Sequence, residues 1–244
     1  MISGPGAGEA LAALDRRIRD LAVRHGAEEW SVPDGMAADT LARAEHFAAF
    51  PGIAVPLDDG SGRFWPPAAC YHLYQSLLGG RLQRPLSVTC VCRCARNEKS
   101  YGSARLRVFT MREVVFIGPA GHVEHERRRW MELVLGFAGA LGLDAGMDAA
   151  SDPFFGPTWR GKKLIQQARH LKFELHVPIV EGEGRIAISS FNLHEEFFGS
   201  RFGFTLDGEP AHSACVGFGL ERWLMALVAR HGRAAAFRIC SEDS

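Results

Sequence analysis

The spacing of apolar residues predicts several amphipathic helices along the chain. Over residues 8–24, apolar side chains recur every three to four positions, and Gly26 then supplies a C-cap. A second stripe of this kind runs from Trp130 to Leu141. Further helices are predicted over residues 36–48, 69–79, 159–170 and 219–230. The helix over 159–170 is basic.

Alternation of apolar and polar residues predicts the strands. Two long strands, over residues 86–96 and 104–118, are separated by a polar hairpin loop, and two more follow over 171–180 and 185–192. A short strand is predicted over 30–33, with loops over 51–68 and 143–158. Since hairpin-connected strands dominate and strand–helix–strand crossovers are few, we predict an α+β fold: an antiparallel sheet flanked by helices. One domain over residues 1–244 is the simplest organisation.

Charge and composition narrow the class of protein. Lys plus Arg and Asp plus Glu both number 28, so the net charge is zero and only a local basic patch could bind nucleic acid. With 47% apolar residues the chain is expected to fold rather than remain disordered. No apolar run reaches the roughly 18 residues of a membrane span, and Asp15 and Arg16 interrupt any signal-peptide core. We expect a cytoplasmic protein without a membrane partner.

Three of the six cysteines alternate along one predicted strand. Cys90, Cys92 and Cys94 are spaced at the strand period, which directs all three thiols to one face. Structural zinc sites usually have two or more residues between paired ligands, so that the chain can turn around the metal. Packing in the core is therefore the favoured interpretation of this trio, and a metal site is the alternative.

Two further patterns could bind a nucleotide. Arg96 and Glu98 end one long strand, and Phe109 lies on the returning strand, so a guanidinium for phosphate and a ring for a base can face one cleft. A solvated strand edge is the alternative. Gly217-x-Gly219-x-x-Arg222 opens the last helix, where backbone N–H groups attract an anion. The alternative is a tight strand-to-helix turn. A dinucleotide-binding motif is excluded because its third glycine and acidic ribose ligand are missing.

Taken together and in order, these patterns resemble the three motifs of class II aminoacyl-tRNA synthetases. The closer resemblance is to the amino acid:carrier protein ligases, homologues of the catalytic core of the zinc-dependent seryl-tRNA synthetases of methanogens. The segments that carry it, besides Pro33 after a helix and the Arg96 motif, are residues 67–71, 109–118, 152–156, 171–175, 190–194 and 212–222.

The resemblance implies a metal site and an amino-acid site. Cys70, Glu113 and Cys215, too far apart in the sequence to form a local motif, take the places of the family's zinc ligands. One Zn²⁺ per protomer is then expected, with an open position for the α-amino group of a small amino acid. Asp152 and Asn192 match positions near the bound amino acid.

The resemblance also implies an ATP site. Arg96 would contact the α-phosphate and the carbonyl oxygen during attack, and Arg222 would lie across the other face of the adenine and contact the γ-phosphate. Glu98 would meet the adenine amino group, while Phe109 would stack on the base. The remaining residues implied around ATP are Arg105, Leu106, Lys172, Ala187, Ile188, Ser189 and Ser190.

The reaction implied is the ATP- and Mg²⁺-dependent activation of glycine or alanine as an aminoacyl-adenylate, followed by transfer to the phosphopantetheine thiol of an acidic carrier protein. Residues 157–170 carry Lys162 and Lys163 without an acidic residue and could dock that carrier, or form a solvated helix face. A homodimer formed around Pro33 is expected, and no tRNA partner. The alternatives are another acceptor, such as a small molecule or coenzyme A, and a non-catalytic paralogue with a binding role.

Overall fold

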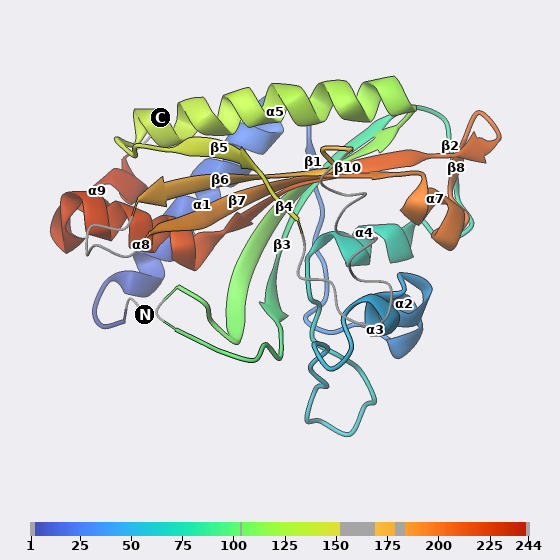
Figure 1. Ribbon diagram of the computed structural model, residues 1–244, viewed down its shortest axis with the longest axis horizontal. Coiled ribbons are helices and arrows are strands. Elements are labelled where there is room, and N and C mark those ends of the chain that lie inside the picture. Colours follow the sequence, from blue (N-terminus) through green and yellow to red (C-terminus); the bar gives the residue numbers. More distant parts are fainter. Residues whose placement is uncertain (1–2, 103, 152–168, 179–183, 243–244) are drawn as a thin grey trace.

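A seven-stranded sheet organises the chain (Figure 1). The computed structural model describes residues 3–102, 104–151, 169–178 and 184–242. In spatial order the strands are β1 (Glu28–Glu29), β3 (Leu86–Ala95), β4 (Val108–Gly118), β10 (His212–Gly219), β7 (Arg185–Glu195), β6 (Lys172–Pro178) and β5 (Gly146–Ala149). β1 pairs with β3 in parallel and all other neighbours in this sheet are antiparallel.

Helices pack on both faces of the sheet, and a cavity opens on one of the two faces. One face, here called the helix-covered face, carries α1 (Ala7–Arg24), α5 (Ala120–Ala140), α8 (Leu220–His231) and α9 (Arg233–Ser241). The other, the pocket face, carries α4 (Cys70–Ser76) and α7 (Phe197–Phe202), with α2 (Ala38–Arg43) and α3 (His46–Ala49) next to α4 (Figure 1). A small sheet of β2 (Arg81–Leu82), β8 (Thr205–Leu206) and β9 (Glu209–Pro210) lies beside α7.

The period of two along β4 separates two hydrophobic clusters. Val114 and Phe116 pack with α1, α5 and α8 on the helix-covered face, whereas Val115 and Ile117 pack with α4 and α7 on the pocket face. Successive side chains of a strand point to opposite faces, so both layers depend on the same central strands. Cys90, Cys92 and Cys94 are buried in the pocket-face cluster, as favoured from their spacing.

A buried arginine joins three elements on the helix-covered face. Arg112 is 1% exposed, and its Nε donates to Oδ1 of Asp15 on α1 at 2.6 Å while its Nη2 reaches Asp15 Oδ2 at 2.9 Å. Its Nη1 donates to Thr89 Oγ1 at 3.2 Å, and its Nη2 lies 3.3 Å from Oε1 of Glu29 on β1. The fork of the guanidinium therefore holds α1 and the edge strand β1 against β4.

The α+β prediction is confirmed, and most of the long elements lie close to their predicted ranges. However, α5 begins ten residues before Trp130, and the central strand β10 was not predicted. Three local predictions are wrong. The helix over 36–48 is broken into α2 and α3, because Glu45 adopts φ 53° between them. The short strand lies at Glu28–Glu29 instead of 30–33, and the predicted loop 143–158 contains the edge strand β5. Most of the predicted helix over 159–170 lies outside the described residues.

Two irregularities on β7 affect the site. Ser213 of β10 pairs with Glu195 and Ala214 pairs with Leu193, so His194 is an extra residue in the ladder. Glu195 takes φ 54° at this β-bulge. A second register shift lies on the β6 side of the strand, at Ile188.

Over the ranges that the structure describes, no helix combines the length and the apolar character that crossing a membrane would require.

Candidate functional site

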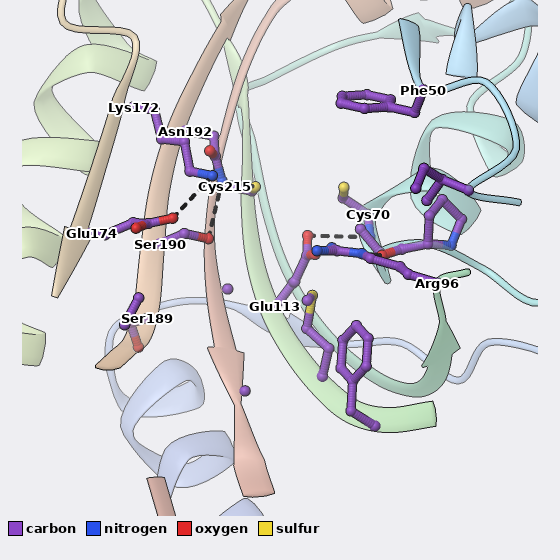
Figure 2. A pocket seen from close by; sticks show the side chains of 18 of the residues that line it. Phe50, Cys70, Arg96, Glu113, Lys172, Glu174, Ser189, Ser190, Asn192 and Cys215 are labelled. Atoms are coloured by element: carbon purple, nitrogen blue, oxygen red, sulfur yellow. Dashed lines mark hydrogen bonds and ion pairs between the residues drawn. The ribbon is translucent and has the colours of Figure 1, made fainter. Parts of the chain in front are cut away.

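A cavity of about 760 Å³ opens on the pocket face of the sheet (Figure 2). Its floor is formed by β4, β10, β7 and β6, and its walls by α3, the start of α4, α7 and the loop between β3 and β4. The size is typical of a site for a small molecule or nucleotide. Of the sixteen site residues predicted from sequence, the structure brings these around it: Cys70, Arg96, Glu98, Arg105, Leu106, Phe109, Glu113, Lys172, Ala187, Ile188, Ser189, Ser190, Asn192, Cys215 and Arg222. Asp152 lies outside the described residues.

Two of these side chains turn away from the cavity. Ser189 Oγ accepts a hydrogen bond from Trp223 Nε1 at 3.0 Å, within the helix-covered face. Ile188 packs in the cluster of that face. Because both side chains are committed to the core, Ser190 and Asn192 supply polar groups to the cavity from the middle of β7 instead (Figure 2), and His194 and Glu195 line it at the end of the strand.

Cys70, Glu113 and Cys215 meet at one end of the cavity, from α4, β4 and β10 (Figure 2). One donor atom from each lies within 4.8 Å of the others, and all three residues are buried. The backbone N–H of Cys70 donates to Glu113 Oε2 at 3.2 Å, which ties the start of α4 to the sheet. Glu113 pairs with Gly217 and Cys215 with Val115, so the strand register sets both side chains on the pocket face.

This cluster is electrostatically suited to a cation. The adjacent Cys215 thiol and burial raise the pKa of Cys70 well above its usual value. Burial also raises the pKa of Glu113, although Cys70 and Arg96 lower it. A bound divalent cation reverses this tendency, since it favours the thiolate and carboxylate forms. Two sulfur donors and one oxygen donor suit Zn²⁺ with a fourth position open.

Two side chains on β7 contact the Cys215 sulfur. Asn192, directly opposite on the neighbouring strand, donates its Nδ2 to Cys215 Sγ at 3.5 Å. His194 Nε2 lies 3.7 Å from the same sulfur. Sequence reasoning placed Asn192 near the amino acid and gave no role to His194. The bulge that brings His194 to the sulfur has no clear sequence signal.

Three arginines, Arg96, Arg105 and Arg222, line the same cavity, and Arg96 lies beside Glu113 (Figure 2). The Arg96 Nε donates to the carbonyl of Pro67 at 2.9 Å, and its guanidinium lies over the Phe109 ring, 5.2 Å from the centroid. Arg222 donates to the carbonyl groups of Ala104, at 2.8 Å, and Ala187, at 3.0 Å. Its two hydrogen bonds fix the direction of the side chain between the β3–β4 loop and β7.

The arginine cluster favours an anion. Burial lowers the pKa of Arg222, and the positive charges of Arg105 and Arg96 lower it further. Arg105 is partly balanced by Glu98, whose Oε2 lies 2.8 Å from Arg105 Nη1. Guanidinium groups that repel one another at the edge of a cavity are stabilised by a polyanion such as a triphosphate.

Two glutamates that the sequence analysis did not single out also line the cavity. Glu174 Oε1 lies 3.1 Å from Lys172 Nζ, and both face β7, where Lys172 pairs with Asn192 and Glu174 with Ser190. Glu221, next to Arg222, accepts the backbone N–H of Thr110 through both carboxylate oxygens, at 2.8 and 2.9 Å. Glu221 therefore anchors the start of α8 to β4.

Gly217 leaves room in the floor of the cavity between Glu113, of the Cys70–Glu113–Cys215 cluster, and Ser190 on β7. A Cβ at this position would lie 3.2 Å from Ser190 Oγ and 3.9 Å from Glu113 Cγ. Because glycine adds no side chain here, the space between Glu113 and Ser190 remains open to a ligand. The cavity thus extends across the sheet from Glu113 on β4 to Ser190 on β7.

No family model matches the chain. Amino acid–acyl-carrier-protein ligases 1 and 2 of Bradyrhizobium diazoefficiens are each 41% identical, over 170 and 174 residues. These matches cover 68% and 70% of this chain and 52% of each relative, so the chain spans about half the length of the curated relatives it matches. Type-2 serine–tRNA ligase of Methanopyrus kandleri is 28% identical over 142 residues, 54% of this chain and 26% of that protein.

Solved structures agree with these relatives on the fold. Seryl-tRNA synthetase of M. kandleri, in a complex with a tRNA, superimposes with a TM-score of 0.79 and 20% identity over 95% of this chain and 53% of the other. Cytoplasmic serine–tRNA ligase of Naegleria fowleri superimposes with a TM-score of 0.78 and 14% sequence identity. The match covers 95% of this chain and 56% of the other. The chain is therefore a relative of the amino acid:carrier protein ligases, homologues of class II aminoacyl-tRNA synthetases, and it has the catalytic-core fold of that class, as its sequence predicts.

Proposed function

We propose that this chain carries out the ATP-dependent activation of a small amino acid and its transfer to the phosphopantetheine thiol of a carrier protein. The observation that supports this most directly is the joining of two different sites in one cavity. A Cys–Glu–Cys cluster suited to Zn²⁺ and a group of arginines suited to a triphosphate line the same cavity, and Arg96 of that group lies beside Glu113. The names of two relatives that are 41% identical supply the carrier protein as acceptor.

The residues of the cavity account for the first half-reaction. Zn²⁺ held by Cys70, Glu113 and Cys215 would supply a Lewis acid that binds the substrate α-amino group. The substrate carboxylate then lies toward Arg96, and its oxygen attacks the α-phosphorus of ATP, which is accompanied by Mg²⁺. The new P–O bond forms as pyrophosphate leaves. Arg96 and Arg222 neutralise the charge that develops, so positioning and electrostatics provide the catalysis without a protein nucleophile.

The aromatic wall beside the cluster favours a small amino acid, glycine or alanine. Phe198 stacks on Tyr74 with ring centroids 4.0 Å apart, and it contacts His194 edge-on at 4.9 Å. Tyr71 lies against the same ring at 5.9 Å. Rings packed on several sides move little, so a large substrate side chain would have to displace the wall.

The proposals for the homodimer and for transfer to the carrier protein are based on the sequence. We retain the homodimer, the single catalytic domain and the absence of a tRNA partner as proposals. The carrier-docking segment 157–170 is described only at Arg169 and His170. Its test is reversal of Lys162 and Lys163 to Glu, which should slow transfer to the carrier and leave adenylate formation intact.

Amino-acid-dependent exchange of labelled pyrophosphate into ATP tests the activity. With all twenty amino acids offered in turn, we expect exchange with glycine or alanine, together with one zinc per chain by metal analysis. Cys215→Ala should lose both zinc and exchange, whereas Cys92→Ala, a matched change of a buried thiol, should keep both. Active protein without zinc, or zinc lost in Cys92→Ala and kept in Cys215→Ala, would overturn the proposed metal site.

The acceptor is tested separately. A holo carrier protein, coenzyme A and tRNA are offered to enzyme that has formed the adenylate. Thioester formation on the carrier alone supports the proposal, and formation on coenzyme A alone supports the other acceptor considered above. No exchange with any amino acid, by zinc-loaded protein, would favour a non-catalytic binding role.

A further inference from the structure

We propose that His194 is a positioning residue of the metal site, which donates a hydrogen bond from Nε2 to the thiolate of Cys215. It would act through this ligand and not touch the metal. The proposal rests on the proposed zinc site and adds to it a group that sets the charge and direction of one ligand.

The β-bulge on β7 places His194 at this sulfur. A regular ladder would pair residue 194 with a residue of β10, but Ser213 pairs with Glu195 and Ala214 with Leu193. His194 is therefore the extra residue of the bulge, and Glu195 adopts φ 54° directly after it. A left-handed conformation costs free energy in a residue other than glycine. Bulges that redirect a side chain are frequent beside functional sites.

The partners of the other ring nitrogen fix the tautomer. His194 Nδ1 lies 3.1 Å from Tyr74 Oη and 3.3 Å from Ser213 Oγ, and both hydroxyl-bearing residues are fully buried. When either hydroxyl donates to Nδ1, the proton of the neutral imidazole resides on Nε2. Nε2 lies 3.7 Å from Cys215 Sγ, so its N–H is directed at the sulfur.

His194 is not placed as a fourth ligand. Among the described residues, the group whose donor atoms all lie within 4.8 Å of one another comprises Cys70, Glu113 and Cys215, without His194. With the imidazole outside this group, the fourth position is left for the substrate amine. Asn192 Nδ2 is a second donor to the same sulfur, at 3.5 Å. Two N–H donors withdraw charge from the Cys215 thiolate, which leaves the cation more electrophilic toward the amine.

Zinc affinity separates this role from packing. His194→Phe keeps the aromatic volume and removes the donor, and we expect zinc affinity in competition with a chromophoric chelator to fall about 10- to 100-fold. His194→Gln retains an N–H donor and should stay within about threefold of the wild type, as a conservative rescue. His231→Phe, which removes the hydrogen bond from His231 Nε2 to the Leu141 carbonyl, is the control for loss of a histidine elsewhere.

Cobalt substitution reports on the sulfur directly. In the Co²⁺-loaded protein, loss of the N–H donor should move the sulfur-to-cobalt charge-transfer band to lower energy in His194→Phe and leave it in place in His194→Gln. Tyr74→Phe, which removes one of the hydroxyls that fix the tautomer, should shift the band in the same direction by less. It serves as the second variant if His194→Phe does not fold.

The outcomes distinguish two failures. If the wild type binds neither Zn²⁺ nor Co²⁺, the proposed metal site is wrong. If the wild type binds both, but removing the donor changes neither affinity nor the band, the site stands and the role of His194 is overturned.

Discussion

The guanidinium of Arg96 covers one side of the Phe109 ring, with its Cζ 5.2 Å from the centroid. The same ring is the predicted platform for adenine, so one side chain would serve the base and the arginine that meets the phosphate. Phe109→Ala should raise the KM for ATP about tenfold, since base stacking contributes about 1–3 kcal/mol. It should also lower kcat, because Arg96 loses its support. Phe109→Tyr keeps the ring and should stay near wild type in pyrophosphate exchange. An unchanged KM in Phe109→Ala would place the base elsewhere.

The open floor at Gly217 predicts a second loss of activity. In Gly217→Val the branched side chain would fill the space between Glu113 and Ser190, where even a Cβ lies 3.2 Å from Ser190 Oγ. We expect exchange to fall at least about 100-fold, as expected when reacting groups are misplaced by an ångström. Gly136→Ala in α5, where a Cβ meets nothing within 4 Å, is the matched control and should leave activity unchanged. Full activity of Gly217→Val would show that substrates do not cross this strand.

A buried histidine predicts sensitivity to acid. Burial, and then the charge of Arg96, lower the pKa of His46 to about 4. The unfolded chain, with an ordinary histidine pKa near 6.5, binds the proton first, so stability is lost as pH falls from about 6.5 to about 4. Between pH 7 and pH 5 this one group should cost about 2 kcal/mol of unfolding free energy.

His46→Gln isolates that contribution. Glutamine does not titrate, so its unfolding free energy, measured with urea at both pH values, should fall by about 2 kcal/mol less than that of the wild type. The same difference between wild type and variant at pH 7 and pH 5 would contradict the prediction. Other groups titrate in both proteins and cancel in this comparison.

The ion pair beneath the sheet predicts an effect on stability alone. Asp15→Ala leaves the 1%-exposed Arg112 with Glu29 as its remaining acidic partner, at 3.3 Å. Removing one member of a buried pair should cost about 3 kcal/mol in urea unfolding. Asp20→Ala, on the same helix and paired with Arg19 near the surface, should cost less than about 1 kcal/mol. Equal effects of the two changes would mean that the Arg112 network is not the anchor of α1.

Much of this architecture could be predicted from the sequence because it depends on local periodicity. The helix over 8–24 and the strands over 86–96 and 185–192 follow from apolar spacing, and each is found within a few residues of its predicted range. The break at Glu45 and the edge strand β5 could not be predicted this way. The break depends on one left-handed residue, and β5 is four residues long and formed by pairing with β6.

The candidate site, in contrast, depends mostly on features that local spacing does not reveal. No local spacing connects Cys70, Glu113 and Cys215, and their meeting depends on the register of β4 with β10 and on the start of α4. The resemblance to a known family supplied that grouping. The position of His194 depends on a bulge, and Ser189 turns toward Trp223 and away from the cavity, so neither orientation followed from residue type.

The period of two along β4 has a consequence for which changes of length this fold could accept. Phe109, Met111 and Glu113 face the cavity, while Arg112 and Val114 are buried beneath the helices. Inserting or deleting one residue within the strand would exchange the two sets, placing Arg112 over the pocket and Glu113 beneath α1. The cavity would lose its binding side chains, and the core beneath the helices would lose its packing, in the same step. An insertion near Ser100, in the hairpin loop before the strand begins at Val108, would keep both sets on their faces and would change only the wall that this loop gives to the cavity.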